Sequence, residues 1–286
     1  MEARHVQIAT NPDAGNYKPK LIEALRAAFA AEGATTSLTY VGPGRQLILD
    51  EETEILCVAG GDGTFRHAAK TILDCGRAVA LAPYPMGTIN LFHRERGYPK
   101  GPADFAKTVL SGARMDQHFP VVINDSLFLG CASIGPDALA VARVSSPLKR
   151  VIGRAAYGVA LAQQLVRWPR PRLTLIADGK RHACEAIYIA KGTYFAGPWT
   201  FAPNAVRTHP KLHVVALKSA SRRRFIRFIR NVMKGRPLED RDNLIVLTCT
   251  SLAVESDAPW PVQADGDDLG VLPITIATRS ETVRVC

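Results

Sequence analysis

A glycine-rich pentapeptide follows the uniformly apolar run 55–59. It reads Gly60-Gly61-Asp62-Gly63-Thr64. A helical pattern begins at Phe65, so the pentapeptide joins a buried strand to a helix. Glycines at such a junction let backbone N–H groups approach an anion, and the helix N-terminus adds partial positive charge. The Asp62 carboxylate would repel a phosphate unless a cation lay between them or a substrate hydroxyl donated to it. The pentapeptide therefore predicts a site for phosphate and Mg²⁺ with an acidic catalytic group.

Two more polar loops follow strand-like runs in the same half of the chain. They read Asn11-Pro12-Asp13-Ala14-Gly15 and Pro85-Met86-Gly87-Thr88-Ile89-Asn90. Gly87 permits close backbone approach, while Thr88 and Asn90 offer hydrogen-bonding side chains. Each loop alone is also typical of an ordinary turn, because turns are rich in Pro, Gly and Asn. Three such loops after three strands of one parallel sheet predict a nucleotide-binding cleft.

The elements that must position these loops alternate in type over the first 120 residues. Strands are predicted at 6–9, 37–41, 55–59 and 78–82, and helices at 20–31 and 65–73. Such alternation is typical of a parallel sheet with helices on both faces. We therefore expect residues 1–118 to form a nucleotide-binding α/β domain.

The pattern changes after about residue 120 to short strand-like runs separated by turn residues. These runs are 121–123, 127–132, 173–177, 186–190, 212–217, 244–250 and 274–277. Two helical stretches interrupt them, near 147–167 and 221–234. Many short strands with turn signals are typical of a β-sandwich or barrel, so residues 119–286 are predicted to form a second domain.

Composition limits the class of protein. The chain has 286 residues, of which 47% are apolar and 22% charged, as in ordinary globular proteins of one large or two modest domains. No run of about 18 apolar residues occurs, so the sequence predicts no transmembrane helix. The six cysteines have neither CxxC nor zinc-binding spacing, which favours a reducing, cytoplasmic environment without disulfides.

Positive charge is concentrated in the middle of the chain. Residues 141–240 contain 20 basic and 4 acidic side chains, within a formal net charge of +10 for the whole protein. A basic region of this kind predicts an anionic partner, for which nucleic acid and a membrane surface are the two candidates. No nucleic-acid recognition motif accompanies the charge, so nucleic acid is the less favoured partner.

The three loops, in this order, resemble the N-terminal motifs of the diacylglycerol kinase catalytic family, which includes bacterial lipid kinases, sphingosine kinases and ceramide kinases. The segment Gly130–Ala138 is similar to the stretch that opens the family's second domain, and Leu148, Lys149, Gly153 and Tyr157 match its helical insert. Asp265-Gly266-Asp267 stands where the family carries Asp-Gly-Glu. The resemblance implies a Rossmann-like α/β domain followed by a β-sandwich domain, with the active site in the cleft between them.

The resemblance also implies an activity and its residues. ATP and Mg²⁺ are the expected cofactors, and the expected reaction transfers the γ-phosphoryl group to a hydroxyl of diacylglycerol, ceramide or a sphingoid base. The expected nucleotide-binding residues are Asn11, Pro12, Gly60, Gly61, Asp62, Gly63, Thr64, Gly87, Thr88 and Asn90. The expected catalytic and metal-binding residues are Asp62, Asp265 and Asp267. Asp267 is favoured as the general base by its position in the motif.

Four positions depart from the family pattern. Asn90 is followed by Leu91 rather than Asp, Asn16 replaces a common Lys, and Asp267 is one methylene shorter than Glu. The stretch 208–212 lacks the usual Asp-Gly, so the sequence does not decide whether the accessory structural Mg²⁺ site of some bacterial members exists here. NAD kinases also use Gly-Gly-Asp-Gly-Thr, so an NAD kinase-like enzyme is one alternative. A catalytically weak, lipid-binding pseudokinase is the other.

A basic helical stretch fits a lipid substrate. Residues 221–235 read Ser-Arg-Arg-Arg-Phe-Ile-Arg-Phe-Ile-Arg-Asn-Val-Met-Lys-Gly. Helical spacing puts an apolar stripe on one side and arginines on another, a pattern shared by helices on anionic membranes and by helices docked on a domain with a solvated basic face. We therefore expect a cytoplasmic enzyme that associates peripherally with the inner face of the membrane. The sequence leaves undecided whether the protein forms a homodimer.

Overall fold

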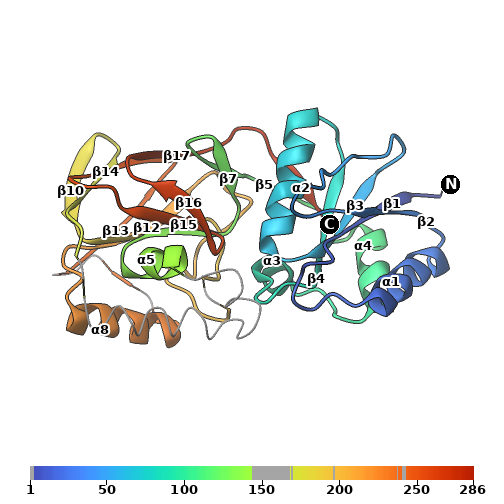
Figure 1. The fold of residues 1–286 in the computed structure, drawn as a ribbon, viewed down its shortest axis with the longest axis horizontal. Coiled ribbons are helices and arrows are strands. Elements are labelled where there is room, and N and C mark those ends of the chain that lie inside the picture. The colour runs from blue at the N-terminus through green and yellow to red at the C-terminus, as the bar shows by residue number, and fades with distance from the viewer. Residues whose placement is uncertain (1–2, 144–167, 169, 196, 237, 240–242) are drawn as a thin grey trace. The chain divides into compact units, whose positions relative to one another are not determined.

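A computed structural model describes residues 3–143, 168, 170–195, 197–236, 238–239 and 243–286 of the protein (Figure 1). The chain forms two compact units, Met1–His118 with Glu281–Cys286, and Phe119–Ser280. From the sequence alone, all of 119–286 is expected in the second domain. The structure instead returns the end of the chain to the first unit, because its last strand pairs with a strand of that unit on each side.

The first unit is built on a six-stranded sheet in the order β2-β1-β3-β4-β18-β5. Its strands are β1 (His5–Thr10), β2 (Thr35–Tyr40), β3 (Ile55–Gly60), β4 (Ala80–Pro85), β5 (Asp116–His118) and β18 (Val283–Val285). All neighbouring pairs are parallel except β18 with β5. Every residue of β3 is buried, as expected for an apolar run covered on both faces.

Helices cover both faces of this sheet (Figure 1). They are α1 (Pro19–Ala31), α2 (Asp62–Cys75), α3 (Leu91–Arg96) and α4 (Pro102–Ser111). α1 and α4 share one face, where the rings of Phe29 and Phe105 meet edge to face at 6.3 Å, and α2 lies on the other. α1 begins with Pro19, whose fixed φ suits a first helical turn. α2 ends at Gly76, whose φ of 66° lies in the left-handed region that glycine adopts readily.

The second unit is a β-sandwich of two six-stranded antiparallel sheets, as the sequence predicts. Their orders are β10-β9-β14-β17-β6-β7 and β13-β12-β11-β8-β15-β16. The strands are β6 (Val121–Ile123), β7 (Ser126–Phe128), β8 (Cys131–Ile134), β9 (Leu173–Ala177), β10 (Lys180–Cys184), β11 (Ala186–Ala190), β12 (Leu212–Leu217), β13 (Leu244–Cys249), β14 (Ser251–Ser256), β15 (Pro261–Ala264), β16 (Asp267–Val271) and β17 (Ile274–Thr278). Alternate side chains of both sheets, such as Leu175 and Ile189, fill one apolar core between them.

Helices α5 (Pro136–Arg143) and α8 (Arg222–Met233) belong to the second unit. Phe225, Phe228 and Val232 of α8 pack against β11 and β12, and the rings of Phe228 and Tyr188 lie 4.6 Å apart. The apolar stripe predicted for 221–234 therefore faces the sandwich rather than a membrane. The helix predicted near 147–167, with the four residues matched to the family's helical insert, lies outside the described residues.

Candidate functional site

Three loops leave the same edge of the first unit's sheet, because β1, β3 and β4 are neighbouring parallel strands. They are the loops 11–15, 60–64 and 85–90, together called the glycine-loop edge below. Asn11 Nδ2 donates to Thr64 Oγ1 at 3.3 Å, which joins the first loop to the second. Asn16 Nδ2, just beyond the first loop, donates to the Gly87 carbonyl at 2.8 Å. The structure thus brings together the three segments that the sequence placed at one edge.

Two glycines of this edge are needed because their backbones nearly touch. A Cβ atom added to Gly87 would lie 2.4 Å from the Gly61 Cα atom, and one added to Gly61 would lie 3.2 Å from the Gly87 Cα atom. The first distance is shorter than any real Cβ contact, so a side chain at Gly87 must displace backbone. The two loops can pack this closely only while residue 87 is glycine, and a side chain at residue 61 would require a small backbone shift.

Asn90 shapes the third loop rather than reaching outward. Its φ of 55° is left-handed, which Asn tolerates better than most residues. Its Oδ1 accepts the Gly87 N–H at 2.8 Å, and its Nδ2 donates to the Gly87 carbonyl at 2.7 Å. The amide therefore closes the turn on itself. Thr88 within that turn is exposed, and its hydroxyl lies on the side of Gly15.

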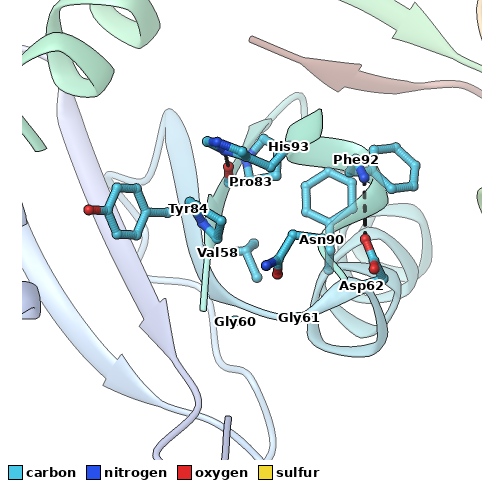
Figure 2. Close-up of a pocket in the computed structure, with 11 residues that line it drawn as sticks. Val58, Gly60, Gly61, Asp62, Pro83, Tyr84, Asn90, Phe92 and His93 are labelled. Atoms are coloured by element: carbon cyan, nitrogen blue, oxygen red, sulfur yellow. Dashed lines mark hydrogen bonds between the residues drawn. The ribbon is translucent and has the colours of Figure 1, made fainter. Parts of the chain in front are cut away.

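Asp62 links the pentapeptide to α3. It is the first residue of α2, directly after Gly61, which caps the helix without a side-chain hydrogen bond. Its Oδ1 accepts the backbone N–H of Phe92 in the first turn of α3 at 3.2 Å (Figure 2). This bond satisfies one of the donors that a helix N-terminus leaves open. Asp62 thus has a structural contact that the sequence did not predict, alongside its predicted catalytic place.

A small pocket lies behind the pentapeptide, between the ends of β3 and β4 and the start of α3 (Figure 2). Its lining includes Asp62, Asn90, Phe92 and His93. His93 is buried, and its Nδ1 lies 3.2 Å from the Pro83 carbonyl, so Nδ1 carries the proton and donates. Burial lowers the pKa of His93, so the neutral ring is favoured there.

The Asp265-Gly266 pair forms the tight turn between β15 and β16. Ala264 pairs with Asp267 across it, and both turn residues have positive φ, 51° and 84°. Two positive φ values are typical of a type I′ hairpin turn, for which Asp-Gly is a favoured sequence. The motif therefore has a local structural cause besides any chemistry.

The Asp265 carboxylate accepts three backbone hydrogen bonds. Oδ2 accepts the Leu129 N–H at 2.9 Å, and Oδ1 accepts those of Gly130 at 2.9 Å and Cys131 at 3.0 Å. A Cβ atom on Gly130 would lie 2.8 Å from Oδ1, so the glycine is needed for this approach. With both oxygens engaged, Asp265 holds the turn against the connection between β7 and β8. The predicted catalytic and metal-binding role of Asp265 stays a prediction beside this structural role.

Asp267 is the first residue of β16 and half-buried. It leaves the turn directly, so the placement of its carboxylate depends on the two turn residues before it. Sequence reasoning missed the side chains that support this turn from below, Gln263, Ser133 and Tyr188. Gln263 has no motif around it that could have marked it. Ser133 belongs to a segment recognised only by resemblance.

The structure describes the two units separately, so the predicted meeting of Asp62 with Asp267 stays a prediction. Within the described residues, no cluster of three His, Cys, Asp or Glu side chains forms a ready metal site. The residues of the three N-terminal motifs, predicted to bind nucleotide, do lie together at the glycine-loop edge. No helix in the part of the chain that the structure describes combines the length and apolar character needed to cross a bilayer.

Comparison with known proteins matches both units to one family. Residues 5–118 match the diacylglycerol kinase catalytic domain, and residues 130–286 match the YegS C-terminal NAD kinase β-sandwich-like domain. A diacylglycerol kinase of Bacillus subtilis is 24% identical over 280 residues, covering 94% of this chain and 92% of its own. A probable lipid kinase YegS-like of Pseudomonas aeruginosa is 36% identical over 105 residues, covering 36% of this chain and 33% of its own.

A solved structure has the same fold. A Bacillus anthracis protein described as a candidate diacylglycerol kinase superposes with a TM-score of 0.81 at 20% identity, over 99% of this chain and 94% of its own. The two domain matches, in this order and over nearly the whole length, agree with the resemblance first seen in the motifs. The chain therefore belongs to the diacylglycerol kinase catalytic family and is a lipid kinase.

Proposed function

We propose that this lipid kinase uses ATP and transfers its γ-phosphoryl group to a hydroxyl of a neutral lipid. The observation that carries the proposal is the glycine-loop edge at the start of α2. The N-cap residue there is Gly61, which has no side chain with which to cap the helix. Backbone N–H groups at such a helix start, approached without Cβ atoms in the way, suit phosphate oxygens. Diacylglycerol, ceramide and sphingoid bases remain the candidate acceptors. Diacylglycerol is the first to test, because the relative from Bacillus subtilis is named for it.

Asp267 is the residue we assign as general base. The lipid hydroxyl oxygen forms a bond to the γ-phosphorus while the bond from that phosphorus to the β–γ bridging oxygen breaks. The hydroxyl proton passes to the Asp267 carboxylate, and ADP leaves with the bridging oxygen. Phosphoryl transfer of this kind depends mainly on positioning and charge neutralisation. A carboxylate at the rim of a rigid hairpin turn suits that requirement.

Asp62 and Asp267 are the carboxylates we assign to Mg²⁺. This ion usually binds proteins through one or two carboxylates and keeps its other positions for water and substrate phosphates. One or two carboxylates therefore suffice, so the proposal does not require a complete protein cage, of which the described residues show none. When bound, Mg²⁺ would neutralise charge on the phosphates. Asp62 Oδ1 accepts the Phe92 N–H, so the orientation of its carboxylate is set before any ligand arrives.

We also propose that the outer face of α8 contacts an anionic membrane surface. Arg223, Arg227 and Arg230 are exposed there, and Ile226 and Met233 beside them are 48% and 50% exposed. Residues 186–238 contain eleven Lys and Arg and no Asp or Glu. Arginines in the first turn of a helix oppose its dipole, so this charge is retained at some cost in helix stability. Anionic headgroups would offset that cost.

The decisive test is turnover of radiolabelled ATP with a panel of neutral lipids in mixed micelles, with NAD as a separate acceptor. We expect a phosphorylated lipid in the wild type and none above background in Asp267→Ala, with nucleotide binding retained. Asp267→Glu should keep more activity than Asp267→Ala. Phosphorylation of NAD alone would favour the NAD kinase-like alternative. Absence of ATP turnover with every lipid would favour the pseudokinase.

The membrane contact has its own test in co-sedimentation with vesicles at two salt concentrations. Each arginine near an anionic bilayer contributes about 1 kcal/mol. Replacing Arg223, Arg227 and Arg230 with Gln should therefore lower affinity for anionic vesicles roughly 100-fold. Higher salt should weaken wild-type binding, because exposed charges are screened beyond about 8 Å at physiological ionic strength. Equal, salt-insensitive binding to neutral and anionic vesicles would overturn the proposal.

A further inference from the structure

A chain of buried polar side chains runs beneath the turn that presents Asp267. Gln263 Oε1 accepts the Gly266 N–H at 3.1 Å, and Gln263 Nε2 donates to Ser133 Oγ at 2.6 Å. Ser133 Oγ donates in turn to Asp137 Oδ2 at 2.5 Å, and the Tyr188 hydroxyl donates to Asp137 Oδ1 at 3.0 Å. The chain crosses four elements from three separate parts of the sequence, namely β8 with the adjoining α5, β11 and β15.

The direction of the hydrogen bonds at Gln263 is fixed from the backbone end of the chain. The Gly266 N–H can only donate, so the carbonyl oxygen of Gln263 must face it and the NH₂ group must face Ser133 Oγ. The Ser133 oxygen is then an acceptor, which leaves its one proton for Asp137 Oδ2. Burial raises the pKa of Asp137, and the hydrogen bonds from Ser133 and Tyr188 oppose that shift. This orientation of the Gln263 amide satisfies both of its partners. The flipped amide, with oxygen and nitrogen exchanged, would break the hydrogen bonds to Gly266 and Ser133.

Burial makes that orientation expensive to lose. Ser133 and Tyr188 are fully buried, and Gln263 is 4% exposed. Burial also raises the pKa of Tyr188 further above neutrality, so its hydroxyl keeps the proton that it donates. A buried donor or acceptor left without a partner is strongly unfavourable, so the chain acts as one rigid support.

We infer that Gln263 is a positioning residue that fixes the turn from which Asp267 acts, and this inference rests on the proposed role of Asp267 as base. The turn is held on two sides. The Asp265 carboxylate ties it to the N–H groups of the connection between β7 and β8, and Gln263 ties the following residue, Gly266, to the interior. Asp267 comes next in the chain, so a shift of Gly266 moves the base directly.

Gln263→Met tests the inference, because Met keeps the length and bulk of the side chain but can make neither bond. A misplacement of about 1 Å at a reacting group can cost roughly 100-fold in rate. We therefore expect kcat to fall roughly 10- to 100-fold, with KM for ATP and lipid within about threefold of wild type. A loss of folded protein alone would lower neither kcat nor kcat/KM when both are expressed per folded molecule.

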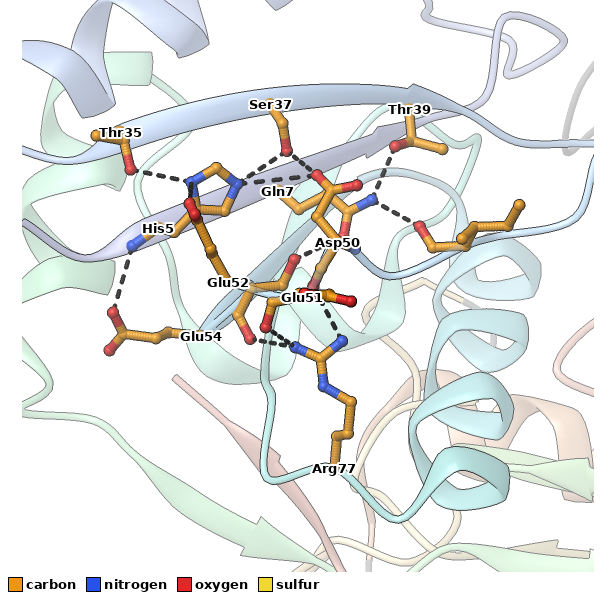
Figure 3. Close-up of polar contacts among 12 residues, drawn as sticks. His5, Gln7, Thr35, Ser37, Thr39, Asp50, Glu51, Glu52, Glu54 and Arg77 are labelled. Carbon is orange, nitrogen blue, oxygen red and sulfur yellow. Dashed lines mark hydrogen bonds and ion pairs between the residues drawn. The ribbon is translucent and has the colours of Figure 1, made fainter.

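The matched control is Gln7→Met in the first unit. Gln7 is also fully buried and makes hydrogen bonds through both ends of its amide, to Thr39, Ile48, Asp50 and Thr53 (Figure 3). Its loss should destabilise the protein while leaving kcat per folded molecule near wild type. An equal fall of kcat in both variants would overturn the inference, since any buried amide would then have the same effect.

A double-mutant cycle adds a second readout. Ser133→Ala should lower kcat less than Gln263→Met, and the double variant should fall no further than Gln263→Met alone, because both act on one turn. Independent, additive losses would overturn the inference. Asp267→Ala separates it from the proposed function. If Asp267→Ala turns over normally, both fail, whereas an inactive Asp267→Ala beside an unaffected Gln263→Met overturns the positioning role alone.

Discussion

Two regions of the first unit's sheet are held in different ways. At the glycine-loop edge, where strands end, the backbones of Gly61 and Gly87 nearly touch, and the short side chains of Asn11 and Asn16 join the loops. The segment 48–54, which leads into the start of β3, is held by long side chains (Figure 3). Arg77 donates to carbonyls of this segment, and Gln7 binds it through both ends of its amide.

The difference agrees with the proposed binding of phosphate at the glycine-loop edge. Around 48–54, the carbonyls of Asp50, Glu51 and Thr53 are occupied by the Arg77 guanidinium at 2.8–3.2 Å. At the glycine-loop edge, the proposed phosphate site is instead the start of α2, where the N-cap residue is Gly61. We therefore expect changes at the glycine-loop edge to affect catalysis and changes around 48–54 to affect stability.

Gly87→Ala should produce the largest effect, because the new Cβ atom would push the backbone of Gly61 away. We expect kcat/KM to fall by more than roughly 100-fold, the cost of about 1 Å of misplacement. The control is Gly101→Ala, where φ is −70° and the nearest atom to an added Cβ is Asp104 Oδ2 at 3.9 Å. Activity of folded Gly87→Ala within a few-fold of wild type would contradict the close-packing argument.

Asp62→Asn separates charge from architecture at the same edge. The amide oxygen can still accept the Phe92 N–H, so α3 should keep its place and the melting temperature should change little. Turnover should nevertheless fall about 100-fold, the lower end for a group that acts on protons or orders a metal. A steady-state assay beside a thermal melt measures both. A variant that melts early but turns over normally would show that Asp62 serves only to hold α3.

Arg77→Met should have the converse outcome. The variant loses the hydrogen bonds to three carbonyls, and we expect the free energy of unfolding to fall by roughly 2 kcal/mol. Urea unfolding gives that difference, with Arg26→Met as the control, because the contact that the described residues offer Arg26 is a solvent-exposed pair with Glu23 at 3.5 Å. The kinetic constants should stay within a few-fold of wild type. A large loss of kcat would break the division between the two regions.

The smallest expected effect is a pH dependence at His93, behind the glycine-loop edge. Burial lowers its pKa, the bond to Pro83 opposes that shift, and the nearby charges of Lys100 and Arg94 add to it. Between the lowered pKa and 6.5 the unfolded chain binds more protons, so stability should rise with pH through this window and be lost as pH falls. His93→Gln should flatten this part of the stability curve. The free energy of unfolding is measured by urea titration at pH 5 and 7.5. An equal change between these pH values in the wild type and in His93→Gln would contradict the assignment.

The sequence predicts the strands that carry the site better than the side chains that hold it. The pentapeptide stands out because an apolar strand, three glycines and a helix start coincide within a few residues. α3 escapes detection because it has six residues and begins at a left-handed Asn90. The role of Asp265 escapes because its three donors lie about 135 residues away in the chain. Such contacts depend on tertiary folding, which no local pattern records.

The return of β18 to the first sheet makes the second unit an insertion within the first. The chain crosses between the units twice, and the strands that flank these crossings are partners, since Val283 pairs with His118. β18 also separates β4 from β5, so a fragment cut after His118 would leave β4 with an open edge. Open edges promote aggregation. During synthesis the first sheet can therefore be completed only after the whole inserted unit has been made.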